Sequence, residues 1–181
     1  MKLALVSAFG VGGATIVGVI IGFFFRKVPH KFNDAILGFA AGIMLSAAIL
    51  GLIIPSLEEG NVWVTAVGIL AGAIFLNLAD KLTPHLHHIT GVDHETHADR
   101  QSNLNKVMLF VMAIAIHNLP EGIAAGVGFG SENISNAITV ALGIALQNIP
   151  EGMVIVSPLI MAGVARKRVF FIACFTGVVE I

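Results

Sequence analysis

The stretch His117-Asn-Leu-Pro-Glu-Gly122 has a counterpart thirty residues later, Gln147-Asn-Ile-Pro-Glu-Gly152. Each copy carries a glutamate and a proline inside a long run of apolar residues. Ionisable side chains are costly in such runs, and those that occur usually have a function. Two matched copies therefore predict a functional site built from two paired segments.

The composition around these motifs is that of a membrane protein. Hydrophobic residues make up 56% of the 181 residues and charged residues 12%, and the mean hydropathy is +0.92. Soluble domains contain about 45–50% apolar and about 25% charged residues. We therefore expect an all-α, polytopic transmembrane helix bundle, because backbone polar groups have no water to bond in lipid. The lone cysteine, Cys174, excludes a disulfide framework and a cysteine-based zinc finger.

Five apolar runs are long enough to cross the bilayer, which takes about twenty residues of helix, and part of a sixth run follows. They predict a single transmembrane domain over residues 1–181, with helices near 3–25, 33–57, 62–80, 105–129, 134–160 and 168–181. The first run is too long for a signal-peptide core and lacks an A-x-A cleavage site. Glycine and alanine crowd these runs, which favours close helix packing and is compatible with a homodimer.

The basic residues fall in alternate connections. Nine of the ten lie on one side of the predicted bundle: Arg26, Lys27, Lys31, Lys81, Arg100, Lys106, Arg166, Lys167 and Arg168. By the positive-inside rule that side is cytoplasmic. We therefore predict a multi-pass protein of the cell membrane with its amino terminus outside, where Lys2 is the exception. The lipid bilayer is its expected partner, and we expect no nucleic-acid partner.

One long polar connection, residues 82–104, is rich in histidine. Its possible ligands are His85, His87, His88, His94, His97, Asp93, Glu95 and Asp99. Imidazole is a good ligand for several divalent metals, but no fixed spacing defines a coordination geometry here. Two interpretations stay open for this cytoplasmic loop: it captures metal, or it is simply solvated.

Helical spacing brings the polar residues of each motif onto one face. His117 shares a face with Glu121, and Gln147 shares one with Glu151, because residues four apart are neighbours on a helix. Side by side, the two faces offer an imidazole, two carboxylates and an amide oxygen. One further residue of each motif could add an oxygen: Asn118 and Asn148. This set without thiolate suits Zn²⁺ or another first-row divalent ion, bound weakly enough to be released.

The prolines of the motifs, Pro120 and Pro150, lack an amide hydrogen and clash with the carbonyl four residues earlier. We therefore expect both helices to kink. Gly122 and Gly152 would then relieve crowding at the kinks. Broken helices in corresponding positions point to the ion site of a transporter.

Several kinds of protein could place such motifs in a membrane. An intramembrane metalloenzyme such as a zinc protease would need H-E-x-x-H, which is absent. A metal sensor would bind its ion in the histidine-rich loop and use the helices as an anchor. Polar packing between the helices is a further alternative. The matched glutamates favour a transporter that is not an enzyme and uses no organic cofactor.

On these residues the chain resembles the ZIP family of divalent metal transporters (zinc/iron-regulated-transporter-like proteins), in particular its bacterial members. The two motifs look like the family's fourth and fifth helices, and the resemblance covers the whole chain, including the segment Gly38–Glu58. It implies an eight-helix bundle with both termini outside and an inverted repeat relating helices one to three with six to eight. It also implies uptake of Zn²⁺ into the cytoplasm as the bundle rocks, with Fe²⁺, Mn²⁺ and Cd²⁺ as alternative ions.

The resemblance implies roles for individual residues as well. One ion site would comprise His117, Glu121, Gln147, Glu151 and, from the second helix, Met44. A second, adjoining site would comprise Asn118, Glu121, Asn148, Glu151 and Glu180. Asp80 and His85 would lie on the cytoplasmic exit route, with His87 and His88 beside them in the loop.

Two departures from the family pattern stand out. Many relatives carry histidine or a carboxylate where this chain has Gln147 and Asn148, and the missing charge argues against a true two-metal centre. The chain also ends at Ile181, one residue after Glu180 and inside the sixth predicted helix. We therefore expect a truncated bundle, a fragment or a shortened product without helices seven and eight, that does not transport metal by itself.

Overall fold

A computed structural model of the chain describes residues 2–24, 30–82, 99–130 and 133–181. Every regular element in these ranges is a helix. The α-helices are α1 (Lys2–Phe24), α2 (His30–Ser46), α3 (Ile54–Glu59), α4 (Val62–Leu82), α6 (Asp99–Val127), α7 (Ile134–Met161) and α8 (Arg166–Val178). A π-helix, η1 (Ala47–Ile53), joins α2 to α3, and a short 3₁₀ turn, η2 (Gly128–Gly130), follows α6.

Five helical stretches are long and apolar enough to span a membrane: Lys2–Phe24, Asp34–Glu59, Val62–Ala79, Lys106–Gly130 and Ile134–Met161. The all-α bundle with five full spans expected from the apolar runs is therefore confirmed. The sixth run contains α8, which has 13 residues.

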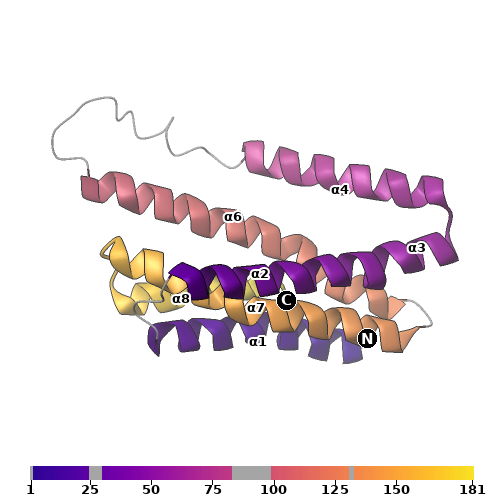
Figure 1. The fold of residues 1–181 in the computed structure, drawn as a ribbon, viewed down its shortest axis with the longest axis horizontal. Coiled ribbons are helices and arrows are strands. Elements are labelled where there is room, and N and C mark those ends of the chain that lie inside the picture. The colour runs from indigo at the N-terminus through magenta and orange to yellow at the C-terminus, as the bar shows by residue number, and fades with distance from the viewer. Residues whose placement is uncertain (1, 25–29, 83–98, 131–132) are drawn as a thin grey trace.

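Helix α7 is the centre of the bundle and packs against α1, α2, α6 and α8 (Figure 1). Its packing with α1 is more extensive than that of any other helix pair in the described ranges. Helix α4 lies at the outside, with exposed apolar side chains such as Trp63, Val67 and Leu70. An exposed apolar face of this kind suits a helix that meets lipid.

Glycines set the distance between α1 and α7. A methyl group added at Gly18 of α1 would lie 2.1 Å from the backbone oxygen of Ile149. One added at Gly152 of α7 would lie 2.2 Å from the backbone oxygen of Thr15. The two backbones are therefore in direct contact, the kind of approach that small residues permit between membrane helices. Gly152 therefore serves the contact between α1 and α7.

Two apolar clusters enclose a polar layer. Along α7, the motif residues Gln147 to Glu151 lie between buried Ile144, in one cluster, and buried Ile155, in the other. Along α1, Thr15 lies in the same way between Val11 and Val19. The polar groups of different helices thus meet at one level of the bundle.

The π-helix inside the second span is a difference from the uninterrupted helix expected there. Pro55 has no N–H group, so the carbonyl of Gly51, four residues earlier, has no α-helical donor. The side-chain amide of Asn136 on α7 donates to that carbonyl at 2.9 Å. Short π-helical segments of this kind are frequent at functional sites.

The motif prolines lie inside longer helices. Pro120 is within α6 and Pro150 within α7, and each helix continues on both sides of its proline. The kinks expected at these positions stay predictions.

We expect Gly18→Ala to lower the free energy of unfolding by about 1–3 kcal/mol, because the added methyl group forces α1 and α7 apart. Thermal unfolding in detergent would measure the effect. The matched control is Gly13→Ala in the same helix, where an added methyl group meets no atom within 4 Å. Equal destabilisation by both variants would contradict the glycine contact.

Candidate metal site

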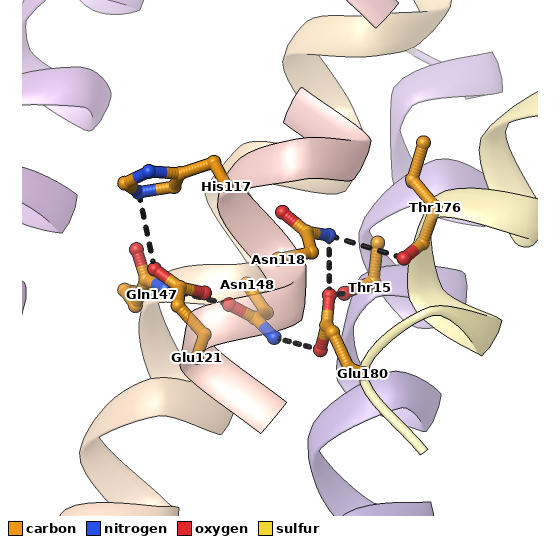
Figure 2. Close-up of polar contacts among 8 residues, drawn as sticks. All are labelled: Thr15, His117, Asn118, Glu121, Gln147, Asn148, Thr176 and Glu180. Carbon is orange, nitrogen blue, oxygen red and sulfur yellow. Dashed lines mark hydrogen bonds and ion pairs between the residues drawn. The ribbon is translucent and has the colours of Figure 1, made fainter. Parts of the chain in front are cut away.

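The two sequence motifs face each other across the contact between α6 and α7. His117 Nε2 lies 3.3 Å from Glu121 Oε1, as the spacing of four residues predicts. Gln147 Nε2, from α7, donates to Glu121 Oε2 at 2.7 Å and so connects the two motifs. Figure 2 shows the three side chains gathered beside one another.

A cavity of about 170 Å³ opens beside these three residues. His117, Glu121 and Gln147 line this cavity together with Met44 of α2, which offers a thioether sulfur. The remaining lining residues are Ala47, Ala48, Leu52, Leu76, Pro120, Ala124, Val140 and Ile144. The structure thus brings four of the five residues expected in the first ion site to one apolar-walled cavity, and η1 forms part of its wall.

A second polar cluster is centred on Glu180, just after α8. Its carboxylate is almost fully buried, with 2% of the residue exposed. Oε1 accepts hydrogen bonds from the Thr15 hydroxyl at 2.9 Å and from the side-chain amide of Asn118. Oε2 accepts one from the side-chain amide of Asn148 (Figure 2). Helices α1, α6 and α7 each contribute a donor to the same carboxylate.

The two clusters are joined through the amides of α7. Gln147 Nε2 also donates to Asn148 Oδ1 at 2.7 Å. Asn148 in turn donates to Glu180, so a chain of hydrogen bonds runs from Glu121 to Glu180. The two neutral residues act here as bridges between carboxylates.

Three buried side-chain oxygens in this region accept no hydrogen bond: Asn118 Oδ1, Glu151 Oε1 and Glu121 Oε1, whose one polar contact is the ion pair with His117 Nε2 at 3.3 Å. Buried polar atoms without partners are unusual and costly. All three belong to residues expected in the second ion site. Carboxylate and amide oxygens are groups that divalent cations accept as ligands, and a bound cation would satisfy them.

The donor set departs from that of a tight metal centre. Within the part of the chain that the structure describes, no group of three or more His, Cys, Asp or Glu side chains is placed to hold a metal ion. The candidate site combines His117 and the carboxylates with amide and thioether groups instead. A site with this composition favours reversible binding over permanent retention.

The structure does not describe the side chains of several predicted site residues. Asp80 belongs to α4, but its side chain is not described. His85, His87 and His88, with the rest of the histidine-rich loop at 83–98, lie outside the described residues. The expectations about the exit route and loop capture therefore stay predictions.

Thr15 was not among the expected site residues, and Gly122 has a contact that was not expected. Thr15 is a single hydroxyl in an apolar run, and nothing local marks it as a partner of Glu180. A methyl group at Gly122 would lie 2.4 Å from the backbone oxygen of Glu180. This glycine admits the end of α8 to α6, a role that only the fold reveals.

Comparison with known proteins agrees with the motifs. The family model described as "ZIP Zinc transporter" matches residues 90–181. The zinc transporter GufA of Myxococcus xanthus is 34% identical over an alignment that covers 99% of this chain and 73% of that protein. The chain belongs to the ZIP family. It is accordingly a multi-pass membrane protein of a transporter family, and the intramembrane enzyme is excluded.

Other ZIP relatives are similar to this chain over different lengths. Zinc transporter ZupT of Chlorobaculum parvum is 35% identical over 93% of this chain and 68% of its own length. Zinc transporter ZIPB of Bordetella bronchiseptica is 36% identical over 67% of this chain and 41% of its own length. Across the three relatives the chain thus spans between 41% and 73% of their length.

We expect Glu180→Gln to lower the free energy of unfolding by about 1–3 kcal/mol, because one accepting oxygen becomes an N–H₂ group that faces other donors. Asn148→Asp alone should also destabilise, since it sets a second carboxylate against Glu180. The double variant Glu180→Gln/Asn148→Asp places an amide donor at position 180 and an accepting carboxylate at position 148. The hydrogen bond between the two side chains can then form again, so stability should recover. Thermal unfolding of all four proteins tests this, and a double variant no better than the singles would refute the contact.

Proposed function

We propose that this ZIP-family protein carries Zn²⁺ across the cell membrane into the cytoplasm through the site between α6 and α7. The observation that carries the proposal is the convergence of Met44, His117, Glu121 and Gln147 on one cavity. The names of the relatives, which are zinc transporters, supply the substrate. Fe²⁺, Mn²⁺ and Cd²⁺ are alternative substrates for such a mixed set of ligands.

The first ion position is the cavity. His117 offers an imidazole nitrogen, Glu121 a carboxylate, Gln147 an amide oxygen and Met44 a thioether, with Glu151 on the adjoining turn of α7. The side chain of His117 is 46% exposed, whereas that of Glu121 is 10% exposed. An ion would therefore meet the imidazole first and the carboxylate next. Binding requires a neutral imidazole and an ionised carboxylate, so it would release any proton held there.

The second position adjoins the first and consists of Asn118, Glu121, Asn148, Glu151 and Glu180. Its support is the set of three oxygens that accept no hydrogen bond, on Asn118, Glu121 and Glu151. Glu121 belongs to both positions, so an ion can pass from one to the other without leaving a carboxylate. Both oxygens of Glu180 already accept amide donors, and Asn148 Oδ1 accepts from Gln147. The first contacts of an entering ion would therefore be Asn118, Glu121 and Glu151.

The orientation of the protein in the membrane follows from the placement of its charges. In Figure 1 the starts of α2, α6 and α8 lie toward one end of the bundle, and α4 runs in the direction of the same end. The described basic residues at this end are exposed: Lys31, Lys81, Lys106, Arg166, Lys167 and Arg168. Helix α3, whose last two residues are Glu58 and Glu59, and the amino terminus lie toward the other end. The positive-inside rule then makes the first end cytoplasmic. The inward direction of transport is carried over from the resemblance to the ZIP family and does not follow from the charges.

We expect uptake of zinc-65 into proteoliposomes by the full-length protein to fall by more than about 100-fold in Glu121→Ala, because both ion positions lose a carboxylate. The matched control is Glu59→Ala, which removes an exposed carboxylate at the end of α3. Unchanged uptake in a folded Glu121→Ala protein would place the pathway elsewhere. Absence of uptake by the wild type would point to a sensor or to another substrate.

We expect the topology to place Glu59 outside and Lys167 in the cytoplasm. The single native cysteine makes this measurable, because Cys174→Ser gives a background without thiols. In intact cells a membrane-impermeant maleimide should label Glu59→Cys, and it should label Lys167→Cys only after the membrane is permeabilised. The reverse pattern would overturn the proposed orientation.

A further inference from the structure

Thr15 differs from the other threonines whose hydroxyl contacts the structure describes. Threonine in a helix usually donates to a backbone carbonyl three or four residues earlier. Thr65, Thr139 and Thr176 do so, at 3.2, 2.9 and 2.7 Å. Thr15 instead donates to Glu180 Oε1 at 2.9 Å, a residue 165 positions away in the sequence.

The carbonyl that Thr15 would otherwise bond has another donor. Val11 is four residues before Thr15, and its backbone oxygen accepts a hydrogen bond from Asn148 Nδ2 at 3.4 Å. Asn148 thus holds the α1 backbone, and the Thr15 hydroxyl is left for Glu180. These two hydrogen bonds, from Asn148 to Val11 and from Thr15 to Glu180, tie α1 to both α7 and the end of α8.

Thr15 is buried, and neighbouring helices approach it closely. Thr15 is 0% exposed and Glu180 is 2% exposed, so water does not replace either partner. A methyl group added at Gly177 of α8 would lie 3.1 Å from Thr15 Cβ. Gly152 of α7 touches the backbone of the same residue. Two helices therefore approach Thr15 through glycines, and its branched side chain has little rotational freedom.

We propose that Thr15 is a positioning residue, which fixes the carboxylate of Glu180 and thereby the orientation of the amides of Asn118 and Asn148 at the ion site. This inference rests on the proposed function. It concerns a residue that does not itself touch the ion.

The orientation of the amides follows from the chemistry of Glu180. A carboxylate only accepts hydrogen bonds, so each asparagine turns its N–H₂ group toward it. The carbonyl oxygens then point elsewhere: Asn118 Oδ1 is left without a donor, and Asn148 Oδ1 accepts from Gln147. The same amides also donate to backbone oxygens, Asn118 to Thr176 at 3.2 Å and Asn148 to Val11 at 3.4 Å. A displaced Glu180 would therefore weaken the orientation of the two amides without abolishing it, and a weaker orientation lets N–H groups turn toward the cation part of the time.

The test compares Thr15→Val, which keeps the shape and removes the hydroxyl, with Thr15→Ser, which keeps the hydroxyl. In zinc-65 uptake by the full-length protein, we expect Thr15→Val to raise KM by about 10-fold with little change in maximal rate, as for other residues that orient metal ligands. Thr15→Ser should return KM close to the wild-type value. Thr139→Val is the matched control, because this exposed threonine bonds only its own helix.

Two results would overturn the inference: a wild-type KM in Thr15→Val, or equal impairment in Thr15→Val and Thr15→Ser. If Thr15→Val does not yield folded protein, Thr15→Ala removes the hydroxyl without adding bulk and should show the same rise in KM. Glu121→Ala separates this inference from the proposed function. Loss of uptake there with a wild-type KM in Thr15→Val refutes only the role of Thr15, whereas full uptake in Glu121→Ala refutes the ion site itself.

Discussion

The hydrogen bonds to the buried carboxylate of Glu180 are the constraint on which the polar centre of this bundle depends. A charge or a polar group among apolar helices is costly unless donors surround it. Three helices supply those donors, through Thr15, Asn118 and Asn148. Side chains this short reach one carboxylate only if the backbones nearly touch. The glycine contacts of α1 with α7, and of α6 with Glu180, are therefore part of the polar site as much as of the packing.

The polar centre has two parts that differ in hydrogen bonding. The carboxylate of Glu180 has donors for both oxygens, whereas Glu121 and Glu151 each keep an oxygen that accepts no hydrogen bond. The hydrogen bonds to Glu180 hold α1, α6, α7 and the end of α8 in one register. Toward Glu121 and Glu151 the buried oxygens outnumber the donors. A fully satisfied network would be stable but would have nothing to offer a cation. Oxygens without donors are groups that a bound cation would satisfy, and this supports the proposed metal site over polar packing alone.

The sequence predicted the local features of this site and not the long-range ones. The five spans and the contact of His117 with Glu121 follow from apolar length and from helical periodicity, which act within one helix. The contact of Thr15 with Glu180 depends on the register between α1 and α8, for which the sequence has no local signal. Gly122 and Gly152 looked like relief for proline kinks, whereas each admits a neighbouring backbone. The π-helix was missed because it takes Asn136 of another helix to satisfy the carbonyl that Pro55 leaves free.

The neutral residues Gln147 and Asn148 give the site its character. An amide both donates and accepts, so the pair can link Glu121 to Glu180 in one chain of hydrogen bonds. A carboxylate at position 148 could not donate to Glu180 and would instead repel it, so it would need a cation or a proton between them. With amides there, the inner cluster is held together by the protein alone. Under the proposed function, an entering ion meets two neutral amides in place of two further charged ligands, which favours passage of one ion over the stable residence of two.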